Sequence, residues 1–248
     1  MHAFLTIAVV QAKLFLREPP AFFFTLVFPV LVIAIFGAMF GNTPSPAFDP
    51  NYGYIDHETP AIIGIIIATI ALMGIPIEVA SSREKKILRR YRATPLRPAT
   101  YLTATISVYF ALAIAGMIIT VIFAKVVYDL RFDGNWFSFF LGLTLSAVSF
   151  FSVGYLIASL ASTARIAQTV GQVLFFPMLF LSGATFPLVM MPDNVRQVSE
   201  FLPLTHAVKL LQHLWFGGNW LDAWFQVLVL AATLGVGMVT AALAFRWE

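Results

Sequence analysis

The chain reads Ser81-Ser-Arg-Glu-Lys-Lys-Ile-Leu-Arg-Arg-Tyr-Arg-Ala-Thr-Pro-Leu-Arg97 between two apolar runs, Pro60–Ala80 and Ala99–Ala124. Seven of the residues from 83 to 97 are lysine or arginine. Each flanking run can form a helix that crosses a bilayer, because about 20 apolar residues are enough. Loops rich in lysine and arginine remain in the cytoplasm. The stretch therefore predicts a membrane protein whose basic loop faces the cytoplasm.

The composition is typical of an integral membrane protein. The 248 residues are 60% hydrophobic and 11% charged, with a mean hydropathy of +0.87, whereas soluble domains average about 25% charged residues. The absence of cysteine excludes disulfides, zinc thiolate sites and cysteine nucleophiles. The net charge of +3 is too small to suggest nucleic acid as a partner, and the positive charge is concentrated in one loop. We expect a single all-α transmembrane domain over residues 1–248, without a cleavable signal peptide.

Six stretches are apolar over the length that a spanning helix needs. They are Ala21–Gly41, Pro60–Ala80, Ala99–Ala124, Trp136–Leu160, Ala167–Leu188 and Trp220–Phe245. The residues before them show helical spacing of apolar positions until Pro19-Pro20 ends the pattern. We expect residues 2–18 to form an amphipathic helix on the membrane surface. Its mostly apolar stripe consists of Phe4, Ile7, Ala8, Gln11, Phe15 and Leu16.

A second interfacial segment is expected at residues 191–219, which are too polar to span. Two amphipathic halves are separated by Pro203, which predicts a re-entrant helical hairpin between helices five and six on the outer side. In the second half, one face is apolar and the opposite face is expected to be polar and solvated. The apolar face holds Val208, Leu211 and Trp215, and the polar face holds His206, Lys209 and His213.

The distribution of charge predicts the orientation of the chain. With the basic loop inside, eleven of the fifteen lysines and arginines lie on the cytoplasmic side. The outer side then carries the other four and eight of the twelve acidic residues, including Asp56 and Glu58 in an outer loop at Asn42–Thr59. Both termini are expected to be cytoplasmic, as six spans require.

Motifs for catalysis or nucleotide binding are missing from the sequence. None of the five lysines follows a glycine, so the core of a nucleotide-binding loop is absent. His206 and His213 have no third zinc partner, and no catalytic, metal or cofactor site is expected in this chain. Any ATP and Mg must therefore bind a separate subunit. Glu78, the one acid expected near a span, should reach the interface and meet the basic loop.

The basic loop has two interpretations. It can be an anchor that fixes orientation and touches anionic lipid headgroups. Alternatively, a helix from Arg83 to Ala93 places Ile87, Leu88 and Tyr91 on one apolar face and stops at Thr94-Pro95. An apolar face and a sharp stop favour docking into a groove of a soluble protein.

Several segments together resemble the permease subunits of ABC transporters of the ABC-2 type, over nearly the whole chain. They are Arg17-Glu18-Pro19, Arg83-Glu84-Lys85-Lys86-Ile87-Leu88-Arg89-Arg90, Arg92-Ala93-Thr94-Pro95-Leu96, Leu181-Ser182-Gly183-Ala184-Thr185-Phe186-Pro187 and Pro203-Leu204-Thr205. One departure is visible, because family members often carry glycine after the Glu-Lys pair, where this chain has Lys86.

The resemblance implies six spans, two permease copies or a pair of related permeases, and two ABC ATPase subunits that hold ATP and Mg. It also implies a bacterial cytoplasmic membrane protein that exports drugs, antibiotics or glycolipid-type molecules. The contacts to the ATPase would come from Arg83, Glu84, Ile87, Leu88, Arg89, Tyr91, Arg92, Thr94 and Pro95, with Lys13, Arg17 and Glu18. The alternative is a membrane interaction or sensory protein that recruits a cytosolic partner without transport.

The route of the cargo is expected along helices two and five, between two copies, with the hairpin closing its outer end. Helix five is expected to be interrupted, which would let it bend. The residues expected at this path or gate are Pro177, Gly183, Pro187 and Pro203. Because the spans hold almost no charge, the cargo is expected to be amphiphilic or apolar.

Overall fold

The computed structural model describes residues 2–16, 22–44, 49–87, 98–186, 188 and 191–244. Every regular element in these ranges is a helix. Six helical stretches are long and apolar enough to cross a membrane: Phe23–Phe40, Tyr54–Glu84, Thr100–Tyr128, Trp136–Leu160, Ala164–Leu181 and Trp224–Leu243. They overlap the six predicted spans, so the prediction of an all-α membrane protein with six spanning helices is confirmed.

Two of these stretches contain a π-helical turn. The first consists of η1 (Phe23–Val27) and α3 (Phe28–Phe40). The second consists of α4 (Tyr54–Thr69), η2 (Ile70–Gly74) and α5 (Ile75–Glu84). The other four are single helices, α7 (Pro98–Tyr128), α8 (Trp136–Leu160), α9 (Ala164–Leu181) and α12 (Trp224–Ala244).

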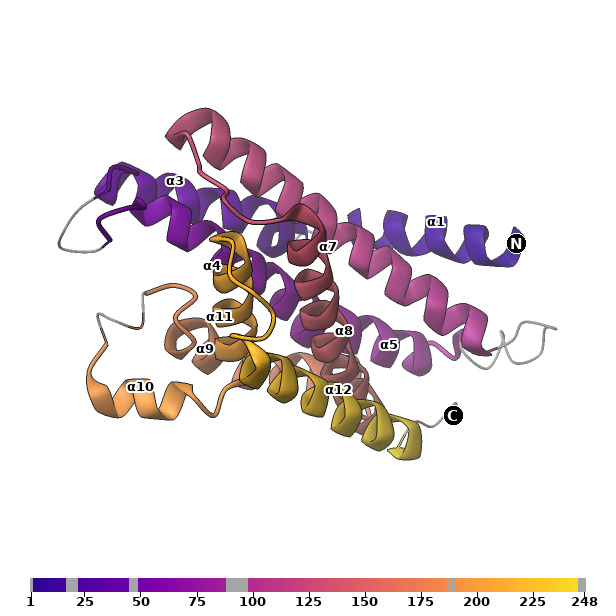
Figure 1. Ribbon diagram of the computed structural model, residues 1–248. Helices are drawn as coiled ribbons and strands as arrows, with labels where there is room; N and C mark the ends of the chain where they lie inside the picture. Colours follow the sequence, from indigo (N-terminus) through magenta and orange to yellow (C-terminus); the bar gives the residue numbers. More distant parts are fainter. Residues whose placement is uncertain are drawn as a thin grey trace.

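The two ends of the bundle differ in what they carry (Figure 1). The N-terminal helix α1 (His2–Leu16), the end of α5, the beginning of α7 and the end of α12 lie at one end. The short helix α10 (Asp193–Ser199) and helix α11 (Pro203–Trp215) lie toward the other end. The elements that adjoin both chain termini are thus at the same end as those that flank the basic segment, residues 83–97. This is the relative arrangement that six spans require.

The second stretch forms the centre of the bundle, since most of its side chains are buried. Helices α8 and α9 approach it through two glycines. A Cβ atom on Gly154 would lie 2.2 Å from the carbonyl oxygen of Ala71, and one on Gly171 would lie 2.0 Å from that of Leu72. Only glycine allows such close contact between helix backbones. Both contacts meet η2, a π-helical turn of the kind that often occurs at functional sites.

The beginning of α4 corrects the predicted outer loop. The helix starts at Tyr54, so Asp56 and Glu58 belong to it and are fully buried. Asp56 accepts hydrogen bonds from the backbone N–H of Gly53 at 3.0 Å, from Asn42 Nδ2 at 2.9 Å and from the backbone N–H of Arg131 at 2.8 Å. Buried carboxylates are tolerated where such donors surround them. Asp56 therefore joins the first span, the second span and the α7–α8 connection.

Helix α1 is described up to Leu16, and residues 17 and 18 of the predicted helix lie outside the described residues. Ile7, Gln11 and Phe15 of the predicted stripe are buried against protein, and Ile7 and Phe4 pack on Tyr101 of α7. The opposite face is also apolar, because Leu5 and Val9 are exposed. The helix is therefore not simply divided into an apolar and a polar side. Its position on the membrane surface stays a prediction.

The hairpin segment contains the two expected helices, with Pro203 as the first residue of α11. The predicted apolar face of α11 is buried, and Trp215 has no exposed surface. The indole N–H of Trp215 donates to the carbonyl oxygen of Arg131 at 2.8 Å. The prediction that His206 is solvated is wrong, because its side chain is 2% exposed and its Nε2 lies 2.8 Å from the carbonyl oxygen of Glu200. That carbonyl pairs with one ring nitrogen where the sequence pattern suggested water.

Candidate functional site

The end of α5 is fixed to the turn between α8 and α9 by two charged side chains. The guanidinium of Arg83 donates to the carbonyl oxygen of Ala158, at 3.1 Å, and to that of Ala161. Glu84 Oε2 accepts from the backbone N–H of Ala164 at 3.2 Å. Arg83 thus satisfies carbonyls at the end of α8, and Glu84 satisfies an amide at the beginning of α9. We call these contacts the Arg83–Glu84 clamp.

The charges of the clamp match the helix ends that they meet. A helix C-terminus carries partial negative charge and favours a cation, and a helix N-terminus favours an anion. The turn between the two helices is short, since α8 ends at Leu160 and α9 begins at Ala164. Thr163 Oγ1 accepts from the backbone N–H of Ile166 at 3.2 Å and caps α9. Movement at the end of α5 is therefore linked directly to both helices.

The predicted helix from Arg83 to Ala93 is corrected at its beginning. Arg83 and Glu84 continue the spanning helix α5, which ends at Glu84. Lys86 then adopts a φ of +56°, the left-handed conformation that commonly ends a helix and that glycine adopts most easily. This gives a physical reason for the glycine that the resemblance led us to expect at this position.

The other residues predicted to contact an ATPase divide into two groups. Ile87 is half-buried and Lys13 is exposed on α1, at the same end of the bundle as the clamp. The rest lie outside the described residues: Leu88, Arg89, Tyr91, Arg92, Thr94, Pro95, Arg17 and Glu18.

Glu78 meets α1 within the described residues, where we expected it to meet the basic loop. Gln11 Nε2 donates to Glu78 Oε1 at 2.8 Å, and Ser82 Oγ donates to the same oxygen at 3.1 Å. Gln11 is buried, so the one polar position in the stripe of α1 is the position that binds the carboxylate. Glu78 therefore ties the N-terminal helix to α5 about one turn before the clamp.

Of the residues predicted at a cargo path, Pro177 lies on α9, Gly183 and Pro187 belong to the segment after it, and Pro203 is the first residue of α11. The expected interruption at Pro177 is absent, because α9 continues through this residue and ends at Leu181. Gly183 then adopts a φ of +82°, and a Cβ atom there would lie 2.7 Å from Leu188. Pro187 lies outside the described residues. The face of α9 that packs on no other described element is apolar, with Val173, Phe176 and Phe180 at least 45% exposed.

Comparison of the sequence with known protein families identifies the family to which this architecture belongs. The model of the family described as ABC-2 type transporter matches residues 2–216. The chain belongs to the ABC-2 type transporter family. The resemblance seen in the short segments is thereby confirmed.

Curated relatives of this ABC-2 chain include two proteins of Escherichia coli strain K12. The probable multidrug ABC transporter permease YbhR is 25% identical over 199 residues, which are 76% of this chain and 52% of that protein. The inner membrane transport permease YhhJ is 26% identical over 204 residues, 80% of this chain and 54% of that protein. Nodulation protein J of Rhizobium leguminosarum bv. viciae is 33% identical over 70 residues, 28% of this chain and 27% of that protein. The chain spans about half the length of the first two relatives.

The ABC-2 sequence did not reveal the partners of its own clamp. Arg83 and Glu84 bind backbone groups 75 to 80 residues away in the chain. Every residue carries a backbone carbonyl, so a sequence pattern cannot identify which one a side chain binds. The only local signal was the short turn between the fourth and fifth spans. Within the described residues, no group of three or more His, Asp or Glu could hold a metal ion.

Proposed function

We propose that this ABC-2 chain is the transmembrane permease subunit of an ATP-driven exporter in a bacterial cytoplasmic membrane. A separate ABC ATPase, present in two copies, binds ATP and Mg and docks on the basic segment. The observation that carries the proposal is the Arg83–Glu84 clamp, which connects that segment to the helices of the bundle. The lack of a nucleotide-binding loop in the sequence supports a separate ATPase.

The mechanism follows from how the basic segment is connected. The segment continues from α5 on one side and leads into α7 on the other. Through the clamp, a push on the segment also reaches α8 and α9. A rotation of the docked ATPase is thereby converted into a movement of the spanning helices, as in other shifts of packed helices.

Two copies of the permease, or this chain and a related permease, form the cargo path between them. The path is lined by the second span (α4, η2 and α5) and the fifth span (α9). The exposed apolar face of α9 supports this arrangement, since it has the composition of a surface that contacts protein, lipid or an apolar cargo. The cargo is an amphiphilic or hydrophobic molecule such as a drug, an antibiotic or a lipid-linked molecule. The name of YbhR as a probable multidrug permease agrees with that class.

The function is tested by reconstituting the full chain in vesicles with the ATPase that copurifies with it. We expect no ATP hydrolysis by the chain alone and ATP-dependent movement of an amphiphilic fluorescent dye by the complex. Leu88→Asp or Tyr91→Asp should release the ATPase, because the loss of an interface anchor costs about 2 kcal/mol or more. Unchanged assembly in both variants would favour the lipid-anchor interpretation, and a copurifying partner without dye transport would favour the sensory alternative.

The proposed orientation predicts which positions can be labelled from outside the cell. Cysteine introduced at Asn194 of α10 should react with an impermeant thiol reagent in intact cells, whereas cysteine at Ser162 should react only after lysis. Both positions are exposed, and the native chain has no cysteine to interfere. Labelling of Ser162→Cys in intact cells, with none of Asn194→Cys, would invert the proposed orientation.

A further inference from the structure

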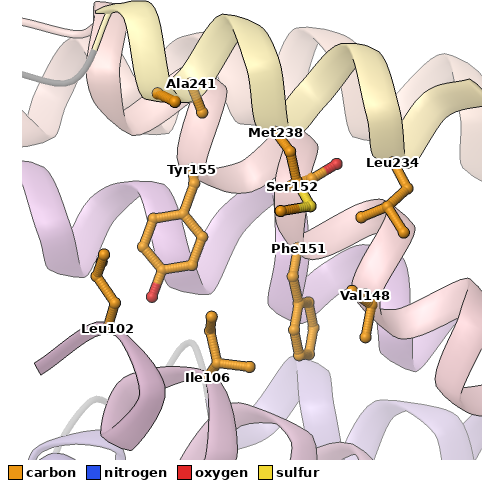
Figure 2. A pocket seen from close by; sticks show the side chains of 10 residues that line it. Leu102, Ile106, Val148, Phe151, Ser152, Tyr155, Leu234, Met238 and Ala241 are labelled. Atoms are coloured by element: carbon orange, nitrogen blue, oxygen red, sulfur yellow. The ribbon is translucent and has the colours of Figure 1, made fainter. Parts of the chain in front are cut away.

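A groove of about 410 Å³ lies between α7, α8 and α12 (Figure 2). Its sides are Leu102 and Ile106 of α7, Phe151 and Tyr155 of α8, and Leu234 and Met238 of α12. The volume falls in the range of about 300–1,000 Å³ that is typical of small-molecule sites. None of these residues belongs to the clamp or to the face of α9 described above.

The groove exists because α12 packs closely on α8 and leaves space beside α7. The hydroxyls of Ser149 and Ser152 donate to the carbonyl oxygens of Leu230, at 2.9 Å, and Thr233, at 3.4 Å. A Cβ atom on Gly237 would lie 2.2 Å from Ser152 Oγ, so glycine is required at this crossing. Small residues and hydroxyls of this kind hold membrane helices together. The groove is therefore built into the fold by the contact between α8 and α12.

The surface of the groove is suited to hydrocarbon. The single hydroxyl proton of Ser152 is shared between the carbonyl oxygens of Ser149, at 2.7 Å, and Thr233, so it is already engaged. The Tyr155 hydroxyl is buried and points toward Leu102 and Ile106. A bound water needs two to four polar partners, which this surface does not offer. The outer flank of α12, including Leu243 at 83% exposure, is apolar and within a spanning helix, so the groove opens toward lipid chains.

The position of the groove along the membrane indicates which part of a lipid enters it. Leu102 lies four residues after the beginning of α7, or about 6 Å along the helix axis. Ala241 lies three residues before the end of α12. In the sequence, Arg97 directly precedes α7 and Arg246 follows α12 by two residues, and both lie outside the described residues. The groove thus runs from the end of the bundle that bears the basic segment toward the middle of the membrane.

We propose that this groove binds one acyl chain of an anionic phospholipid from the leaflet on the side of the basic segment. The hydrocarbon lies against Phe151, Leu234 and Met238, and the phosphate lies at the membrane surface, near the helix ends that Arg97 and Arg246 adjoin in the sequence. Basic positions between helices at this depth attract anionic headgroups. The lipid fills a gap that would otherwise leave the lining side chains without contacts.

The experiment uses the purified full chain and two photoreactive probes, a phosphatidylglycerol and a phosphatidylcholine with the same diazirine-bearing acyl chain. We expect the phosphatidylglycerol probe to label peptides of α7 and α12. Ala242 lines the groove, and Ala242→Phe should lower this labelling about tenfold, as if roughly two methylenes had left the groove. Leu243→Phe, next to it but outside the lining, is the matched control and should keep wild-type labelling.

A second set of variants separates the contribution of the lipid headgroup from that of the acyl chain. Arg97→Gln combined with Arg246→Gln should lower phosphatidylglycerol labelling roughly tenfold, to the phosphatidylcholine level. Equal labelling by both probes in the wild type, or labelling that Ala242→Phe leaves unchanged, would overturn the proposal. A change of oligomeric state in Ala242→Phe would also overturn the proposal, because it would show that a second copy of the protein occupies the groove. Met238→Trp, at the exposed rim, supplies the same comparison if Ala242→Phe does not fold.

Discussion

Replacing Trp215 with alanine is expected to lower the free energy of unfolding by about 3–5 kcal/mol, the range for the truncation of a fully buried aromatic residue. Trp215 has no exposed surface, and its ring lies 4.8 Å from that of Phe132 and 5.2 Å from that of Phe139. Its indole N–H also satisfies the carbonyl oxygen of Arg131. One residue of α11 thus holds the α7–α8 connection against the hairpin. The measurement is the midpoint of thermal unfolding in detergent.

Two further variants divide this effect into its parts. Trp215→Phe keeps most of the aromatic contact but leaves the Arg131 carbonyl without its donor, which costs about 1–3 kcal/mol. Trp224→Ala is the matched control, since Trp224 is 61% exposed at the beginning of α12, and surface changes stay within about 0.5 kcal/mol. Equal midpoints for Trp215→Ala and Trp224→Ala would contradict the assignment of Trp215 as the core of this end of the bundle.

The six spans could be predicted because their signal is compositional and continuous. About 20 apolar residues in a row leave few alternatives to a spanning helix. The boundaries were harder to predict where polar residues enter a helix. Asp56 and Glu58 were placed in a loop because isolated carboxylates avoid the membrane. Three donors surround Asp56, and two of them come from parts of the chain whose proximity no local pattern records.

The candidate site was predictable in its position but not in its contacts. Charge density marks the segment after the second span, and Lys86 departs from the family pattern at the position where the backbone adopts a positive φ. Helical periodicity correctly placed Gln11 in the buried stripe of α1, yet it could not identify Glu78 as its partner. His206 was wrongly placed in solvent because amphipathic spacing shows which residues share a face and not what covers that face. Contacts between a side chain and a distant backbone group can be identified only once the fold is known.

The second large effect is expected for Arg83→Ala, which should reduce the stimulation of the ATPase by cargo about tenfold, within the range typical of coupling between distant sites. The variant removes both hydrogen bonds to the end of α8. It leaves Ile87, Leu88 and Tyr91 in place, so the ATPase should still copurify. Transport by reconstituted vesicles should fall with the stimulation, because a docked ATPase would then move α5 and α7 without the Arg83 link to α8.

Variants at the two neighbouring positions make this result specific to the clamp. Glu84→Gln keeps an oxygen that can accept from the Ala164 N–H and should retain most of the coupling, whereas Glu84→Ala loses the bond and should resemble Arg83→Ala. Lys85→Ala is the control, since Lys85 is exposed and its side chain makes no hydrogen bond or ion pair within the described residues. Loss of ATPase binding in Arg83→Ala would instead make Arg83 a docking residue. Full coupling in both Arg83→Ala and Glu84→Ala would show that the contact between the end of α5 and the α8–α9 turn transmits nothing.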